Sequence, residues 1–228
     1  MQHRPEESVQ NLIRGNPDAL LAKKILVCEG KTEIGICRFL REFWATRHNG
    51  EPIENQGVAL ANGGGGEQSQ IALHLAKLGY SVGLFRDSDV ALKKEDRSAL
   101  VKANVRIFEW TDNLSTEERL YADVSADGVQ KMFEIAVQKY GTESVGARMK
   151  NISKLECPVR EKIENWNFSG KSKVEIRQLI AQTAKAKNVG WYKDISTGEK
   201  LGEVVVSEIE LKPTLPFAVT LRGIEIWD

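Results

Sequence analysis

The sequence predicts an α/β protein: a parallel sheet with a helical insertion or appended helical subdomain and a short C-terminal β segment. Three observations support this prediction. Apolar runs alternate with amphipathic stretches in the first half, a helical periodicity follows, and the tail alternates and is rich in valine and isoleucine. The expected divisions are a linker or helix (1–20), an α/β core (21–117), a helical subdomain (118–195) and C-terminal strands (196–228).

Within the core, four apolar runs predict strands: "KILVCEG", "GVALAN", "YSVGLFRDSD" and the end of "SALVKANVRIFEW". Amphipathic stretches between them predict helices, including "KTEIGICRFLREFWATR" and "EQSQIALHLAKLG", the latter stopped by Gly79. Before the first strand, "NPDALLAKK" predicts a short helix capped by Asn16 or Asp18. Because the carboxyl ends of parallel strands meet at one edge, residues directly after strands are expected to share a site.

Composition limits the possible functions. The 228 residues are 41% apolar and 28% charged, which is typical of a soluble globular protein with one domain and an insertion, or two small domains. Thirty-two basic residues balance 32 acidic ones, so a globally basic nucleic-acid binder is not indicated, although a local basic face is allowed. Three cysteines without C-x-x-C spacing, and the lack of a signal peptide or a long apolar run, predict a cytoplasmic location without membrane contact.

The "GKT" triplet, Gly30–Thr32, resembles the end of a phosphate-binding loop. That loop requires a glycine five residues earlier, where this sequence has Ile25 inside a predicted strand, so a nucleotide site of this type is excluded. A second glycine run lies between Asn62 and Ser69 and could bring the backbone close to a phosphate. No lysine follows at the helix start, so a flexible strand-to-helix turn is the favoured interpretation.

Four acidic residues follow predicted strands. Glu29 ends the first strand, Glu33 lies one helical turn later, and Asp87 and Asp89 end a later strand. Any one of them alone could be a solvated loop acid, but four converging carboxylates repel each other unless a cation is bound. Carboxylate oxygens are the ligands that Mg²⁺ prefers, together with water and substrate phosphate. The combination therefore indicates a metal site.

A glutamate after the first strand and a D-x-D after a later one resemble the Toprim domain, which topoisomerases, bacterial primases and some nucleases share. The longer series "ILVCEGKTE", "GGGG", "LGYSVGLFRDSD" and "WYKDISTGEKLGEVV" resembles the C-terminal nuclease region of the OLD (overcoming lysogenization defect) family. The resemblance runs from about Leu20 to the end and is nearest to the branch often encoded beside a helicase. It implies a Toprim-like Rossmannoid core and a possible helicase partner.

In the OLD family this region follows an N-terminal ABC-type ATPase domain. No complete Walker motif occurs here, so the resemblance implies a nuclease half without its ATPase. The segment "RPEESVQNLIRGNPDALLAKK" is similar to the family's linker, and on that interpretation Met1 need not be the natural start. The expected activity is a metal-dependent DNA endonuclease that cuts or nicks duplex DNA with little sequence preference, since no base-reading element is recognisable.

The resemblance also implies a two-metal mechanism with Mg²⁺ or Mn²⁺. One ion helps to activate water and the other steadies the leaving oxygen, with the ions about 4 Å apart. The implied metal ligands are the four acids above, of which Glu29, Asp87 and Asp89 are also expected to be catalytic. An S-x-E element of the family corresponds to Ser115 and Glu117, which would serve the second ion.

The register of that last element is open, because Glu118 is an alternative to Glu117. The same segment, "NLSTEERLYADVS", also reads as a helix start at which Ser115 caps and Glu118 completes a capping box, and the two interpretations are compatible. The family further uses a lysine to stabilise negative charge on phosphate. Lys173 is the preferred candidate, followed by Lys171, and Lys193 is a third.

A non-catalytic module, a topoisomerase and a primase are the alternatives to a nuclease. The main alternative is a non-catalytic nucleic-acid-binding Toprim module whose acids hold one structural metal. A topoisomerase needs an activated tyrosine, and the four tyrosines lie in no recognisable motif. A primase would need a nucleotide-handling element that the sequence does not display.

Overall fold

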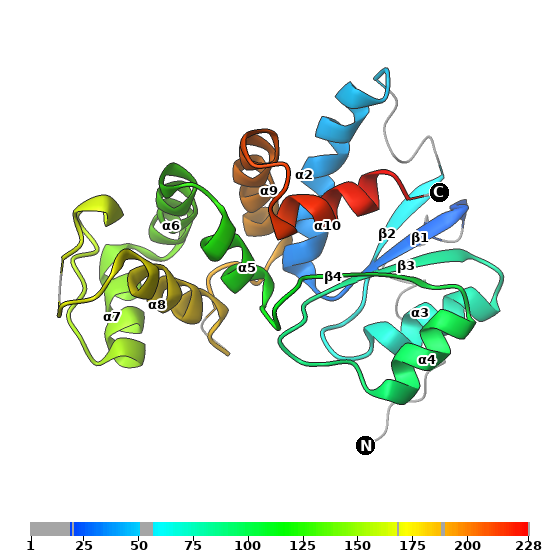
Figure 1. Ribbon diagram of the computed structural model, residues 1–228, viewed down its shortest axis with the longest axis horizontal. Helices are drawn as coiled ribbons and strands as arrows, with labels where there is room; N and C mark the ends of the chain where they lie inside the picture. Colours follow the sequence, from blue (N-terminus) through cyan, green and yellow to red (C-terminus); the bar gives the residue numbers. More distant parts are fainter. Residues whose placement is uncertain (1–18, 20, 51–56, 168, 188–189, 228) are drawn as a thin grey trace.

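One parallel sheet organises the first half of the protein. The computed structural model describes residues 19, 21–50, 57–167, 169–187 and 190–227. Its four strands lie in the order β2-β1-β3-β4 (Figure 1). Their bounds are β1 (Lys24–Cys28), β2 (Val58–Asn62), β3 (Ser81–Arg86) and β4 (Arg106–Glu109). All four strands were predicted from the apolar runs. The linker or helix predicted for 1–20 lies outside the described residues, with the exception of Ala19. The predicted capping residues Asn16 and Asp18 are therefore also outside the described part of the chain.

The strand register places the carboxyl ends of the central strands level with each other. Cys28, the last residue of β1, pairs with Asn62 on one side and with Phe85 on the other. The next backbone amide, that of Glu29, donates to the Phe85 carbonyl at 2.8 Å and continues the ladder. Glu29 and the residues after β3 therefore leave the sheet side by side.

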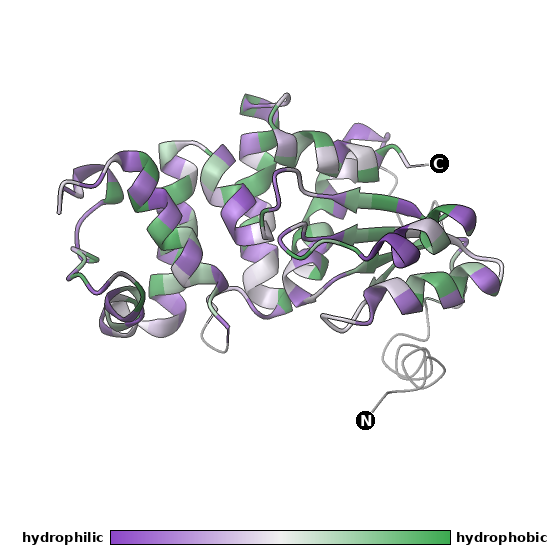
Figure 2. Ribbon diagram, turned by 60° about the horizontal axis from the view of Figure 1, so that its bottom comes forward, coloured by the Kyte–Doolittle hydropathy of each residue, from purple (hydrophilic) through white to green (hydrophobic). Residues whose placement is uncertain are grey.

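Helices cover both faces of the sheet. Successive strand side chains point to opposite faces, so Leu26 and Cys28 belong to one apolar cluster and Ile25 and Val27 to another. Helices α3 (Gln68–Lys77) and α4 (Lys94–Lys102) supply the second cluster, while α2 (Lys31–Arg47) lies on the opposite face (Figure 1). Figure 2 shows strands that are largely hydrophobic and helices with hydrophobic and hydrophilic sides.

The second half of the chain is helical, as the periodicity after residue 118 predicted. Its helices are α5 (Thr116–Asp123), α6 (Ala126–Tyr140), α7 (Thr142–Ser153), the 3-10 turn η2 (Ile163–Asn165) and α8 (Lys173–Lys185). Trp166 and Trp191 pack edge-on against Phe133, with ring centroids 5.3 and 5.8 Å apart. These tryptophans are buried and belong to the core of the helical part.

The C-terminal strands predicted for 196–228 are wrong. The described part of the tail forms two helices, α9 (Ile195–Leu211) and α10 (Pro216–Glu225). The valine run suggested a strand but is too short to establish one. The buried positions of this segment follow a helical spacing: Leu201, Val204, Val205 and Ile209. Asp194 caps α9 by accepting a hydrogen bond from the Thr197 amide at 2.9 Å.

Small residues let α9 approach α2 closely. A Cβ atom on Gly35 would lie 2.3 Å from the Ile195 carbonyl oxygen and 2.6 Å from the Gly198 Cα, which no real Cβ tolerates. This contact brings the loop before α9 over the start of α2, where the Thr32 hydroxyl donates to the Tyr192 carbonyl at 2.6 Å. Helix α10 then packs beside β4 (Figure 1). None of the described helices is long and apolar enough to cross a membrane.

Candidate metal centre

Glu29 and Asp87 form the base of the candidate centre. They follow the neighbouring strands β1 and β3, as the sequence predicted, and the Asp87 amide donates to Glu29 Oε2 at 2.9 Å. Ile25 is fully buried within β1, so the "GKT" triplet is the start of helix α2 and not a phosphate loop. The sheet edge thus fixes two carboxylates next to each other.

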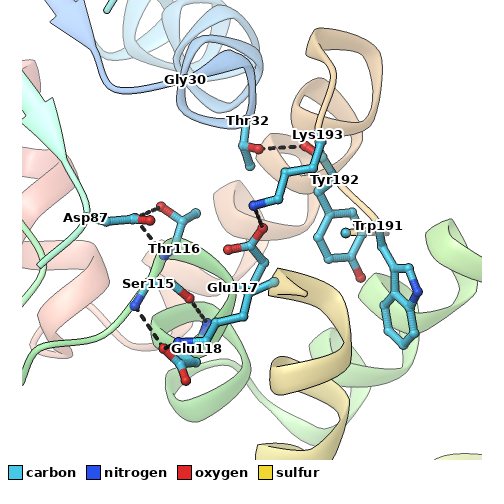
Figure 3. Close-up of polar contacts among 12 residues, drawn as sticks. Gly30, Thr32, Asp87, Ser115, Thr116, Glu117, Glu118, Trp191, Tyr192 and Lys193 are labelled. Carbon is cyan, nitrogen blue, oxygen red and sulfur yellow. Dashed lines mark hydrogen bonds and ion pairs between the residues drawn. The ribbon is translucent and has the colours of Figure 1, made fainter. Parts of the chain in front are cut away.

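Glu33 and Thr116 connect α2 and α5 to these two acids. Glu33 is buried in the first turn of α2 and accepts a hydrogen bond from the Gly30 amide at 3.0 Å. The Thr116 hydroxyl lies 2.7 Å from both Glu33 Oε1 and Asp87 Oδ1. The Thr116 amide also donates to Asp87 at 2.7 Å, and Figure 3 shows both contacts of Thr116 with Asp87. Three segments distant in sequence therefore converge on one hydroxyl group.

The Thr116 hydroxyl cannot satisfy both carboxylates. Its oxygen already accepts a hydrogen bond from Trp110 Nε1 at 2.7 Å, and a hydroxyl has a single proton to donate. One of the two acids, Glu33 or Asp87, is therefore left facing an oxygen unless it is itself protonated or a cation is present. This is the arrangement in which carboxylates are held ready for a positive charge.

Burial and mutual repulsion raise the pKa values of these acids. Burial, and then the charge of Glu33, raise the pKa of Asp87 to about 7. Burial raises the pKa of Glu29, and Asp87 raises it further. Burial likewise raises the pKa of Glu33, which also feels the charge of Glu117. A divalent cation would favour the charged forms of all of these groups.

Glu117 and Lys193 complete the inner part of the centre. Glu117 is 1% exposed on α5, and its Oε1 accepts a hydrogen bond from Lys193 Nζ at 2.7 Å (Figure 3). Burial opposes the charged form of Lys193, but Glu117, then Glu33 and Asp87, outweigh it and raise the pKa of the lysine. The ammonium group therefore carries its charge beside the carboxylates.

Asp89 lies at the rim of the centre. Its carboxylate is 3.7 Å from Lys185 Nζ, which also donates to Glu118 Oε2 at 2.8 Å. Asp89 contributes repulsion that raises the pKa values of Glu29 and Asp87, which places it close to both. The predicted D-x-D pair is thus divided between a half-buried position, Asp87, and an exposed one, Asp89.

The segment before α5 forms the predicted capping box. The Ser115 hydroxyl accepts a hydrogen bond from the Glu118 amide at 3.3 Å, and the Ser115 amide donates to Glu118 Oε2 at 3.1 Å. Glu118 is therefore used by the cap and by Lys185, whereas Glu117 faces the other acids. Ser115 is buried with its side chain in the cap, and it reaches the centre only through its neighbours in the chain.

The structure does not bring Lys173, the preferred catalytic lysine, to the carboxylates. Its ammonium group donates to the Glu164 carbonyl, and the side chain is exposed at the start of α8. Lys171 acts on Cys157 electrostatically, again outside the acidic cluster. Of the three candidates, Lys193 is the one with a hydrogen bond to a carboxylate of the cluster, that of Glu117.

The carboxylate oxygens of the candidate centre are the type of ligand that hard divalent cations prefer. Their positions do not form a complete ligand shell for an ion. Among the described residues, no three His, Cys, Asp or Glu side chains form a group positioned to hold a metal ion. Each inner carboxylate instead accepts at least one hydrogen bond from an amide, from Thr116 or from Lys193. Binding an ion would require these carboxylates to turn from their present donors toward the ion.

Sequence reasoning missed Thr116 and Lys185. Thr116 lies between two residues that were singled out, but a threonine in "STEE" carries no signal of its own beyond the helix start. Its role depends on Trp110 and on two acids from other segments. Lys185 is the last residue of a helix that reaches the centre only through tertiary packing against α5.

Comparisons with protein-family models, with curated proteins and with solved structures returned no match for this chain.

Proposed function

We propose that this chain is a metal-dependent DNA endonuclease, the nuclease part of an OLD-type protein with a Toprim-like core. The observation that carries the proposal is the convergence of Glu29, Glu33, Asp87 and Glu117, with Lys193 beside them, at the carboxyl edge of a parallel sheet. The buried Glu33 and the half-buried Asp87 share one hydroxyl proton, an arrangement that is costly without a cation, which supports a site that works with bound ions.

Divalent ions held by these acids would supply water activation and neutralise charge on the phosphate and leaving oxygens. The residues of the chain would orient and balance that chemistry. The Asp87 amide and the Thr116 amide fix the two carboxylates of the sheet edge relative to each other. Lys193 would turn its ammonium from Glu117 to a phosphate oxygen and stabilise the negative charge that grows there.

Plasmid cleavage tests this function directly. Purified protein is incubated with supercoiled plasmid in Mg²⁺, in Mn²⁺ and in EDTA, together with Asp87→Asn and Glu29→Gln variants. We expect nicked and linear products in at least one ion, none in EDTA, and at least about a hundredfold slower cleavage by both variants. Asp127→Asn is the matched control, because Asp127 is an exposed acid of α6 paired with Lys131.

The results that would overturn the proposal are equally specific. A parent protein that cuts in neither ion, or an Asp87→Asn variant that cuts as fast as the Asp127→Asn control, is incompatible with it. DNA binding that persists in EDTA without any cleavage would favour the non-catalytic binding module instead. Circular dichroism of each variant separates loss of chemistry from loss of folding.

A further inference from the structure

A groove lies between α5 and α8 and ends beside the candidate centre. Its volume is about 630 Å³, and its apolar floor includes Leu114, Ala122 and Ala181. Glu118 lines the same groove and is bridged through Lys185 to Asp89, at the rim of the acidic cluster. Lys185 therefore links the groove to the rim of the candidate centre.

The wall formed by α8 carries positive and amide groups. Lys173 and Arg177 are four residues apart, lie on the same face of the helix and both line the groove. Two exposed glutamines, Gln178 and Gln182, line the groove farther along the helix. Among the described residues that line it, Glu118 is the one acid, and Lys185 neutralises it.

Arg177 is held in place at the middle of this wall. Its NH1 group donates to the carbonyls of Tyr121 and Val124 at 3.3 and 2.8 Å. A guanidinium has five N–H donors, so these bonds fix the side chain while donors remain for a phosphate. The charge of Arg177 is therefore positioned in advance.

We propose that the α5–α8 groove binds one strand of DNA, and that this strand is unpaired where the strand leaves the candidate centre. This inference rests on the proposed nuclease function. Lys173 and Arg177 line the groove, and its one acid, Glu118, is paired with Lys185, so the charges favour a negatively charged occupant such as a phosphate backbone. A cavity of about 630 Å³ between two packed helices has room for one strand and not for a duplex.

Binding to a short labelled oligonucleotide tests the groove. Anisotropy is measured at several salt concentrations in the full chain carrying Asp87→Asn, which prevents cutting. We expect Lys173→Gln to weaken single-strand binding several-fold and to lower the salt slope by about 0.7. A Gln178→Glu/Gln182→Glu double variant adds two negative charges to the groove and is expected to weaken binding at least tenfold.

The matched control is Lys102→Gln. Lys102 is an exposed lysine at the C-terminal end of α4, which leads away from the carboxyl edge of the sheet, so its loss is expected to leave binding unchanged. Because Lys173, Gln178 and Gln182 are all exposed, their variants are expected to fold, and circular dichroism verifies this.

Three results would overturn the groove assignment. They are equal binding by the Lys173→Gln and Lys102→Gln variants, an unaffected double-glutamate variant, or duplex DNA that binds more tightly than a single strand. Plasmid cleavage by the parent protein is measured separately and tests the nuclease proposal. A chain that binds through the groove without cutting loses the nuclease proposal alone, whereas a chain that cuts with unaffected groove variants loses this inference alone.

Discussion

Thr116 has a larger part in the candidate centre than a single threonine usually has, because its hydroxyl contacts Trp110, Glu33 and Asp87. A Thr116→Val variant keeps the shape but leaves the buried Trp110 Nε1 without its acceptor and removes the hydroxyl contact of Glu33 Oε1, while the Thr116 amide still donates to Asp87. We expect the free energy of unfolding, measured with urea in EDTA, to fall by about 1–3 kcal/mol.

Thr46→Val is the control for that measurement, since Thr46 is exposed on α2 and donates only to the Phe43 carbonyl of its own helix. Its effect is expected to stay within about 0.5 kcal/mol. Equal losses in the two variants would contradict the role assigned to the Thr116 hydroxyl.

Asp87 makes stability depend on pH. Its pKa is raised from 3.8 to about 7 by burial and by Glu33, so between these values the folded state holds a proton that the unfolded state has lost. Stability in EDTA is therefore expected to decline as the pH rises from about 4 to about 7, with each unit of the pKa shift corresponding to about 1.4 kcal/mol.

Two variants and one ion check the cause of that decline. Asp87→Asn is expected to flatten the decline and to be more stable than the parent above about pH 7, while the exposed-acid control Asp127→Asn behaves as the parent. Mg²⁺ is expected to restore stability to the parent at high pH and to do little for Asp87→Asn. Urea unfolding across this range would contradict the assignment if Asp87→Asn and the parent declined alike.

Lys193 is the residue whose charge is best placed for the chemistry. Lys193→Gln removes the ammonium group beside Glu117, and we expect plasmid cleavage to slow by about a hundredfold or more. Lys171→Gln is the matched control, because Lys171 precedes α8 and interacts with Cys157. Similar rates for the two variants in a single-turnover assay would remove Lys193 from the proposed mechanism.

At the scale of elements, the crossing of α2 over α9 positions the candidate centre. A Gly35→Ala variant would place Cβ 2.3 Å from the Ile195 carbonyl oxygen, so the helices must separate. We expect a loss of about 1–3 kcal/mol in urea unfolding. Cleavage is also expected to slow, because α2 carries Glu33 and α9 follows Lys193.

Gly223→Ala on α10 is the control for the helix crossing. Its added Cβ meets Phe108 at 3.6 Å, an ordinary contact, and alanine favours a helix over glycine by about 1 kcal/mol. The control is therefore expected to be neutral or stabilising. A Gly35→Ala variant as stable as Gly223→Ala would show that the two helices are not in the close contact described.

The same elements show what a sequence can predict. Strands β1 to β4 and the helices between them follow from apolar runs of the right length, and the positions of Glu29 and Asp87 follow from strand ends. The tail could not be predicted in this way. The run "VVV" satisfies a strand pattern locally, while the helix that contains it is decided by packing of its glycines, Gly198 and Gly202, against α2. Tertiary contacts outweighed the local preference of valine.

The residues of the candidate site also differ in whether local sequence or tertiary packing decides their positions. Acids directly after strands were predicted because strand direction fixes where they lie, whereas Lys193 belongs to a loop whose path depends on the α2–α9 contact. Lys173 was preferred for its sequence context, yet the helix that carries it turns its ammonium to the Glu164 carbonyl. Residues brought in by packing between distant elements leave no local pattern.

At the scale of the whole molecule, one apolar core extends from the sheet into the helical half. It includes Leu26 of β1, Trp110 after β4, Trp166 and Trp191 of the helical part, and Leu221 of α10. The chain passes from sheet to helices and returns, so neither half buries its surface without the other. Such continuity favours cooperative unfolding over separate unfolding of two domains.

We therefore expect one unfolding transition. Far-ultraviolet circular dichroism reports all helices, and tryptophan fluorescence reports both the sheet side through Trp110 and the helical side through Trp166 and Trp191, so the two urea curves are expected to coincide. Mg²⁺ bound only by the folded state should shift both curves together, because the centre takes Glu33 from α2 and Glu117 from α5. Two separated transitions, or an ion that shifts only one of the signals, would mean that the sheet and the helices fold independently and that the centre forms only when they meet.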